Sequence, residues 1–142
     1  MMIYTTYLSK LKNIPDNAIK IFIARRSKPV IQDTLKKYNC IWYKDFGPSK
    51  TLHDELLNHE IPFMLFEARY IVEQFKLRNI NQTWNNYITT IKEADKQGKD
   101  IYLICYEKDD NECHRKAFRQ IVTLLTDIES KEADFNENSK SC

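Results

Sequence analysis

Reactive side chains concentrate in one short segment of the chain, residues 105–115. Cys105 and Glu107 end the run Ile101–Glu107, whose aromatic and β-branched residues are typical of a buried strand. Alternate residues of a strand point to the same face, so we expect the Cys105 thiol and the Glu107 carboxylate to lie side by side. After a short loop, Cys113–Arg115 (Cys-His-Arg) opens a segment with helical periodicity. The pattern predicts a strand–loop–helix unit with several reactive groups at one end.

These groups suggest anion binding combined with acid–base or nucleophilic chemistry. A helix N-terminus offers free backbone N–H groups and a partial positive charge, and Arg115 there could bind a phosphate or carboxylate with two N–H groups. Cys113 beside this helix start is in a setting that favours the reactive thiolate. Glu107 could act as a base, a nucleophile or an acceptor for a substrate hydroxyl, and His114 could transfer a proton. We therefore predict Glu107, His114 and Cys113 as catalytic residues.

Two other expected strands end in basic and polar residues. Arg25 and Arg26 close the run Ala18–Arg26, and Lys44 follows the run Cys40–Tyr43. Ligands of open α/β sheets bind beyond the carboxyl ends of the parallel strands, so these residues should meet at one edge. The resulting prediction is a phosphate- or anion-binding site formed by Arg25, Arg26, Tyr43, Lys44, Ser49, Cys105 and Arg115.

Other interpretations of the same residues stay open. Each side chain also has an ordinary structural explanation, such as a buried Cys105 in the core or a solvated arginine at the surface. A nucleophilic Cys113 with a histidine base is one chemical alternative. Zinc is another, with ligands Cys105, Cys113 and His114 and a fourth from Glu107, Cys40, His53 or His59. The wide gap between the cysteines, and the divergence of adjacent helical side chains, lead us to expect no metal and no cofactor.

The elements that must position these residues alternate between strands and helices. Short strand patterns cover Met2–Tyr7, Ala18–Arg26, Cys40–Tyr43 and Ile101–Glu107. Helical patterns lie between and after them, and the clearest are Phe63–Leu77, the segment that follows Thr83, and Cys113–Ile128. Within Phe63–Leu77 the apolar stripe consists of Met64, Ala68, Ile71, Val72 and Phe75. We predict an α/β fold, with a largely parallel sheet of about four strands flanked by helices in a Rossmann-like three-layer arrangement.

Length and composition narrow the possibilities further. The 142 residues fit a single α/β domain over 1–128, followed by a polar tail over 129–142 that we expect to be disordered. Two glycines exclude the glycine-rich phosphate loops, and a net charge of +2 is too small to indicate nucleic-acid binding. The chain has neither an apolar run of membrane-spanning length nor a signal-peptide core. We expect a cytoplasmic protein whose four cysteines are free thiols, and we expect no association with membranes.

The motifs resemble a known family. The segment Ile101–Ile121, with Leu-Ile-Cys-Tyr-Glu followed by Cys-His-Arg, is similar to the signature of the bacterial and phage family DUF488, a domain of unknown function. Supporting stretches are Ile3–Tyr7, the turn Leu11–Pro15, and the loop from Tyr43 to Ser49, so that the resemblance covers about residues 2–128. It implies the α/β fold and the position of the site, but it implies no reaction.

Two positions depart from the family pattern. Lys28–Ile31 replaces an aromatic stretch that usually follows the second strand, and Gly47 stands where alanine is common.

We predict a protein that acts on a nucleotide, a nucleoside or a nucleic-acid-derived substrate. The alternative is a non-catalytic interaction protein, such as a phage-type inhibitor or regulator on the same fold.

Overall fold

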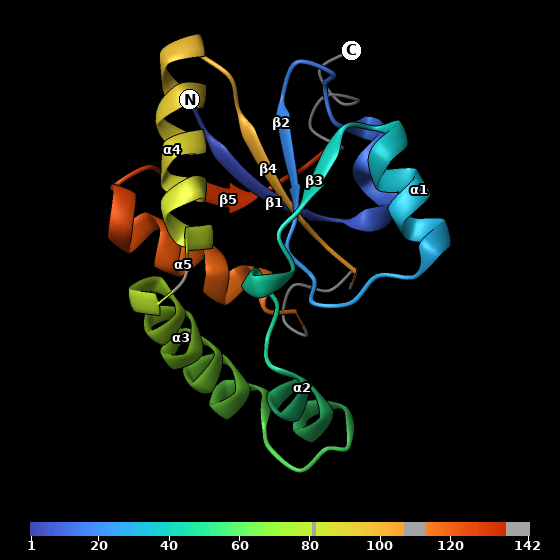
Figure 1. Cartoon of the computed structure of the whole chain (residues 1–142), viewed down its shortest axis with the longest axis vertical. Helices are drawn as coiled ribbons and strands as arrows, with labels where there is room; N and C mark the ends of the chain where they lie inside the picture. The colour runs from blue at the N-terminus through green and yellow to red at the C-terminus, as the bar shows by residue number, and fades with distance from the viewer. Residues whose placement is uncertain (81, 107–112, 136–142) are drawn as a thin grey trace.

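A five-stranded parallel sheet forms the centre of the molecule (Figure 1). The structure, a computed structural model, describes residues 1–80, 82–106 and 113–135. The strands have the spatial order β3-β2-β4-β1-β5. Their bounds are β1 (Ile3–Tyr7), β2 (Ile19–Phe22), β3 (Cys40–Trp42), β4 (Ile101–Cys105) and β5 (Ser130–Glu132). Because all pairs are parallel, the carboxyl ends of β2, β3 and β4 meet at one edge, as predicted.

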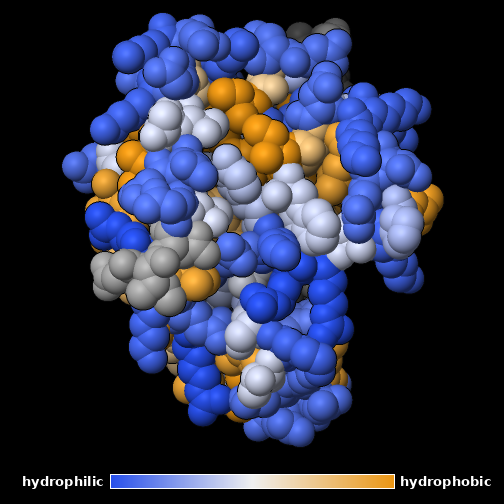
Figure 2. All heavy atoms as spheres, in the orientation of Figure 1, coloured by the Kyte–Doolittle hydropathy of each residue, from blue (hydrophilic) through white to orange (hydrophobic). Residues whose placement is uncertain are grey.

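Helices cover both faces of this sheet. They are η1 (Leu8–Asn13), α1 (Pro29–Lys37), η2 (Lys44–Phe46), α2 (Lys50–Leu57), α3 (Phe63–Ile80), α4 (Gln82–Gln97) and α5 (Arg115–Thr126). Helix α1 and η1 lie on one face, whereas α4 and α5 lie on the other, and α3 packs against both α4 and α5 (Figure 1). The predicted α/β three-layer arrangement is confirmed. Hydrophilic side chains dominate the face shown in Figure 2, with apolar side chains visible between them over the sheet.

Side-chain alternation along the strands builds two separate cores. In β2 and just beyond it, Ile21 and Ile23 join the larger core under α3, α4 and α5, while Phe22 and Ala24 join the smaller core under α1 and η1. This is the alternation that the sequence indicates for a strand buried on both faces. It places the next residue of the larger-core series, Arg25, at the carboxyl edge on the same side of the sheet as Cys105.

The fifth strand, Ser130–Glu132, lies in the segment that we expected to be a disordered tail. Ser130 pairs with Ile3 in register, and Ala133 N donates to Thr5 O at 2.8 Å. The sequence of β5, Ser-Lys-Glu, has no apolar pattern. Main-chain pairing with the otherwise open edge of β1, together with the hydrogen bond from the Thr5 hydroxyl to the Glu132 carboxylate, holds this strand in the sheet. The sheet therefore has one strand more than expected, and the folded region extends beyond residue 128.

Helix α3 buries a different face from the one that the apolar stripe predicted. Met64 is 81% exposed, and Val72 and Phe75 are also exposed. The buried face carries Tyr70, whose hydroxyl donates to Phe46 O at 2.5 Å, and Gln74, whose amide oxygen accepts from the Trp84 indole. The helix therefore presents Phe66, Tyr70 and Gln74 to the interior, and two of these three side chains are hydrogen-bonded to other elements. None of the described helices is long and apolar enough to cross a lipid bilayer.

Candidate functional site

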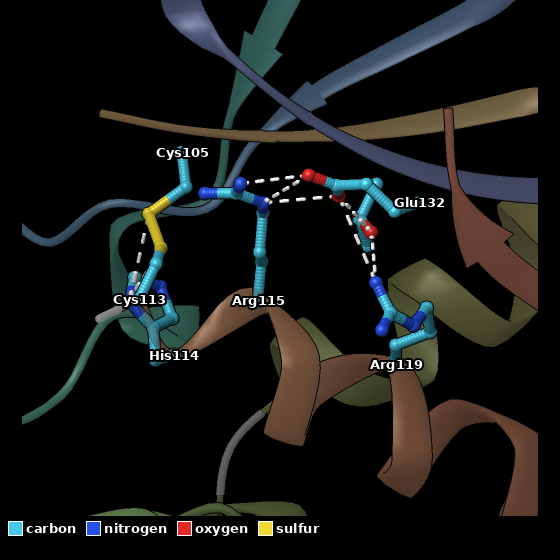
Figure 3. Close-up of polar contacts among 7 residues, drawn as sticks. Cys105, Cys113, His114, Arg115, Arg119 and Glu132 are labelled. Carbon is cyan, nitrogen blue, oxygen red and sulfur yellow. Dashed lines mark hydrogen bonds and ion pairs between the residues drawn. A yellow bond between two sulfur atoms is a disulfide. The ribbon is translucent and has the colours of Figure 1, made fainter. Parts of the chain in front are cut away.

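Cys105, Cys113 and His114 meet in the buried space between the end of β4 and the start of α5 (Figure 3). Each is less than 6% exposed. The two cysteines form a disulfide. The expectation of free thiols was therefore wrong for this pair, because the connection from β4 to α5 returns the chain to the strand it has just left. Cys40 is a free thiol, buried in the smaller core, and burial raises its pKa to about 12.

The imidazole of His114 is fixed by the backbone of β2. Its Nε2 donates to Ile23 O at 2.8 Å, because a carbonyl oxygen can only accept. The other nitrogen, Nδ1, faces both sulfurs, at 3.7 Å from Cys105 Sγ and 3.9 Å from Cys113 Sγ. Burial lowers the pKa of His114 to about 4. At neutral pH the ring is uncharged and presents a lone pair at Nδ1, so it has no second proton to transfer.

Two cavities open beside this cluster. One, of about 630 Å³, separates Cys113 and His114 from the α2–α3 segment, which contributes His53, His59 and Glu60 among mainly apolar residues. The other, of about 130 Å³, lies between His114 and the loop after β2. Its lining residues are Ala24, Arg25, Arg26, Pro48, Lys50, His53, Cys105, Tyr106 and His114.

A larger hollow of about 690 Å³ continues from the smaller cavity across the ends of β2 and β3. We call it the basic depression, and it is lined by Arg25, Arg26, Ser27, Lys28, Trp42, Lys44 and Tyr106. The four cationic side chains are exposed and have neither a hydrogen bond nor an ion pair with any residue that the structure describes. Two aromatic rings therefore share one concave surface with four cationic side chains that form no ion pair with any described residue.

Close packing of the η2 loop fixes the backbone of Arg25. A Cβ atom added to Gly47 would lie 2.6 Å from Arg25 Cα, well inside van der Waals contact. The Trp42 indole N–H donates to Ala24 O at 2.7 Å, and Tyr43 N donates to Phe22 O at 3.0 Å. Glycine at position 47 is thus required by the close approach of two chain segments, and here alanine would not fit.

Comparison with known proteins identifies the family. The chain matches the family DUF488-N3a, described as the active DUF488-N3 subclade, over residues 3–125. The protein belongs to the DUF488 family. No curated protein and no solved structure gives a significant match. The resemblance seen in the sequence is confirmed, and the substrate and reaction of this DUF488 protein are left to inference from its own residues.

Arg115 of the DUF488 Cys-His-Arg segment lies away from the cavities. Its side chain is fully buried, and its guanidinium binds the carboxylate of Glu132, with Nη2 to Oε2 at 2.7 Å and Nε to Oε1 at 3.1 Å (Figure 3). The same guanidinium stacks over the ring of Tyr7, 5.8 Å from its centroid. The Arg115 guanidinium, which we expected to bind a substrate anion, thus binds the carboxylate of Glu132 instead.

Ser49 and Tyr43, which we also expected to bind an anion, contact other residues of this DUF488 protein. The Ser49 hydroxyl caps α2 by accepting from Leu52 N, and the Glu73 carboxylate accepts from both the hydroxyl and the backbone N–H of Ser49. Tyr43 is half-buried, with its ring edge-on to Phe46 at 5.4 Å. Of the predicted anion-binding residues, only Arg25, Arg26, Lys44 and Cys105 line the smaller cavity or the basic depression.

One predicted site residue lies outside the described part of the chain, and several residues that line the basic depression were not predicted. Glu107, predicted to be catalytic, lies outside the described residues. Trp42, Tyr106 and Lys28 line the basic depression without having been proposed as site residues. Trp42 and Tyr106 are immediate chain neighbours of predicted residues at strand ends, so the same positional rule applied one residue earlier or later would have found them.

Proposed function

We propose that the protein is an enzyme that binds a phosphate-bearing nucleotide or nucleic-acid-derived substrate in the basic depression. The observation that carries this proposal is the concave surface on which the unpartnered cations and two aromatic rings lie together. Phosphate is the ligand that clustered Arg and Lys side chains favour, and nucleobases stack on aromatic rings. The description of the subclade as active also supports catalysis rather than binding alone.

Each part of the depression has a distinct role in this proposal. Arg25 and Arg26, which also line the smaller cavity, bind the phosphate nearest to the Cys105–His114 cluster. Lys44 adds charge at the end of β3. Trp42 and Tyr106 form the stacking platform for the base; Trp42 is held by its hydrogen bond to Ala24 O, and Tyr106 by edge-on packing against Phe22.

The catalytic acid or base in this proposal is Glu107. It follows Tyr106 directly in the chain, and Tyr106 lines both the smaller cavity and the basic depression. In this proposal the Glu107 carboxylate activates a water or a substrate hydroxyl, or contacts a ribose. His114 is a positioning residue here, because its Nε2 is committed to Ile23 O.

Binding measured by calorimetry with three probes tests the proposal. The probes are 5′-AMP, adenosine and inorganic phosphate, which separate the contributions of the base and the phosphate. We expect 5′-AMP to bind more tightly than either fragment, and its affinity to fall with added salt. The double variant Arg25→Ala/Arg26→Ala should weaken 5′-AMP binding at least tenfold. The matched control Arg78→Ala/Lys92→Ala, on exposed positions of α3 and α4, should leave binding unchanged.

Turnover is tested separately from binding. Nucleotide mixtures incubated with the protein are separated chromatographically, and Glu107→Gln should retain 5′-AMP affinity while losing any turnover that the wild type shows. If none of the three probes binds to the folded wild-type protein, the proposal fails.

A second candidate function, a non-catalytic interaction protein, is favoured by one observation. Met64, Val72 and Phe75 on α3, together with Leu57 on α2, expose apolar side chains to solvent. Exposed apolar side chains that gather into a patch mark a contact with another protein, and in this second candidate function the partner is a second copy of this chain. Light scattering of the wild type and of Met64→Lys/Val72→Lys would show self-association that the substitution abolishes.

A further inference from the structure

Three buried ligand atoms lie within 4.8 Å of one another at the floor of the cavities: Cys105 Sγ, Cys113 Sγ and His114 Nδ1. We propose that, when the disulfide is reduced, these three atoms bind a single Zn²⁺ ion whose fourth position opens to the cavities. The proposal concerns the cysteine–histidine cluster alone and does not depend on nucleotide binding in the basic depression.

The distances around His114 Nδ1 are close to those of a tetrahedral zinc site. Zinc lies about 2.3 Å from thiolate sulfur and about 2.0–2.1 Å from imidazole nitrogen, so a tetrahedral centre places sulfur and nitrogen about 3.6 Å apart. The observed separations are 3.7 Å to Cys105 Sγ and 3.9 Å to Cys113 Sγ. Once the S–S bond is broken, the sulfurs need only separate to about 3.8 Å, the spacing that the same geometry requires.

The surroundings of His114 point to a ligand independently of the distances. Because Nε2 donates to Ile23 O, the neutral ring has a bare lone pair at Nδ1. That nitrogen is buried and faces two disulfide sulfurs, which have no proton to donate, and no described residue donates to it. A metal ion takes up this lone pair directly. An imidazole with one nitrogen bound to a backbone carbonyl and the other facing thiolates has the orientation that zinc-ligating histidines typically adopt.

The fourth coordination position is open within the described part of the chain. Cys40, considered above as a fourth ligand, belongs to the smaller core on the opposite face of the sheet. His53 and His59 line the cavity of about 630 Å³ but are not members of the cluster. Sites with three protein ligands and one position left for water or substrate are characteristic of catalytic zinc, whereas structural zinc has four protein ligands. The cluster has the two-cysteine, one-histidine composition of such open sites.

The disulfide and the zinc site are alternative states of the same two sulfurs. A phosphine reduces the disulfide by taking the oxygen atom of one water, and the two protons of that water remain on the thiols. Zn²⁺ then binds both sulfurs and releases these two protons to solvent. The protein cannot hold the disulfide and the Zn²⁺ ion at this cluster at once, so the metal content should follow the redox state.

The wild-type protein tests the proposal without any substitution. The full chain is reduced with tris(carboxyethyl)phosphine under anaerobic conditions and titrated with Zn²⁺ against a chromophoric chelator. We expect one Zn²⁺ per reduced chain and none per chain oxidised to the disulfide. Co²⁺ added to the reduced protein should give the intense visible bands of a tetrahedral site together with sulfur-to-cobalt charge transfer. Equal zinc content in the two redox states, or no zinc in the reduced chain, would overturn the proposal.

Substitutions identify the ligands. Cys105→Ser, Cys113→Ser and His114→Gln should each lower zinc affinity at least 100-fold, and the matched control Cys40→Ser should keep it. Circular dichroism of each variant checks folding, and if a variant unfolds, the redox dependence of zinc binding in the wild type still decides the question. Measuring 5′-AMP affinity on the zinc-free protein separates the two proposals: retained 5′-AMP binding without zinc binding sinks the zinc site alone.

Discussion

Arg115 and the pair Arg25–Arg26 all follow central strands at the same edge of the sheet, yet their environments are opposite. Arg115 is fully buried, and its guanidinium is bound to Glu132 through three hydrogen bonds of 2.7–3.2 Å. Arg25 and Arg26 are exposed, line the basic depression and bind no described side chain. The first arginine is paired inside the fold, whereas the other two are exposed at a concave surface.

The difference in burial between Arg115 and the pair Arg25–Arg26 arises because, of these three arginines, the described chain pairs only Arg115 with a carboxylate. Burying a guanidinium requires a carboxylate, because an uncompensated buried charge costs several kcal/mol. Glu132 on β5 supplies it and also lies near Arg119, at 3.7 Å. No carboxylate forms an ion pair or a hydrogen bond with Arg25 or Arg26 in the described structure. The pKa of Asp54 is lowered by its hydrogen bond from Lys50 and also by the charge of Arg26, so Asp54 is the carboxylate whose charge Arg26 senses. Arg115, although it is part of the Cys-His-Arg motif, is therefore paired inside the fold and does not line the basic depression.

The largest expected effect comes from removing the partner of Arg115. Glu132→Ala should lower the free energy of unfolding by about 3 kcal/mol, because it leaves the buried guanidinium without its carboxylate. Urea denaturation measures this loss, and 5′-AMP affinity of the folded variant should be unchanged. Glu93→Ala, on the exposed weak pair with Lys96, is the control and should change stability by less than about 0.5 kcal/mol. A large loss of nucleotide affinity in folded Glu132→Ala would show that Arg115 acts in binding after all.

A second substitution tests whether the position of Arg25 matters. Gly47→Ala forces its Cβ against the Arg25 backbone and should cost about 1–3 kcal/mol while also weakening 5′-AMP binding. Gly98→Ala is the matched control. Its cost of about 1–2 kcal/mol comes from a backbone φ of +66°, with no atom in contact with the added Cβ. Gly98→Ala should therefore destabilise the protein without altering affinity, and equal affinities in the two variants would contradict the positioning role of Gly47.

The buried environment of Arg115 and the exposed environment of Arg25 and Arg26 could not be distinguished from the sequence. Alternation along residues 19–25 predicts a strand buried on both faces, and the two cores on either side of β2 confirm this. For Arg115 the decisive partner is Glu132, in a three-residue strand without an apolar pattern, formed because β1 has an open edge. Such pairing depends on the completed sheet rather than on local sequence.

The same limit explains the orientation of α3. Its apolar stripe predicts one buried face, but the helix turns Tyr70 and Gln74 inward instead. Their partners include Phe46 O and Asp45 O, which lie 24 and 29 residues away along the chain. Periodicity measures apolar surface and carries no information about which polar groups will find a distant acceptor. The convergence of Cys105 with His114, in contrast, followed directly from a parallel sheet and a short connection.

The third prediction concerns the exposed arginines themselves. Arg26→Ala should weaken 5′-AMP binding by about 1 kcal/mol, roughly fivefold, because it removes one charge-assisted contact. The thermal midpoint should be unchanged, since the side chain has no described protein partner. Arg26→Lys keeps the charge and should lose less affinity than Arg26→Ala. A drop in stability without a change in affinity would assign Arg26 to the structural class of Arg115.

The smallest effect is expected for a third kind of arginine, one that is both paired and exposed. Arg69 Nη1 lies 2.7 Å from Glu55 Oε2, the same distance as the Arg115–Glu132 contact, but the Arg69 side chain is 49% exposed. Water solvates both charges before and after the pair breaks, so Arg69→Ala should change stability by less than about 0.5 kcal/mol. Urea denaturation of Arg69→Ala and of Glu132→Ala, measured side by side, compares the stability lost with two contacts of equal length that differ in burial. If the two losses were equal, burial would not be the property that separates the structural arginine from the others.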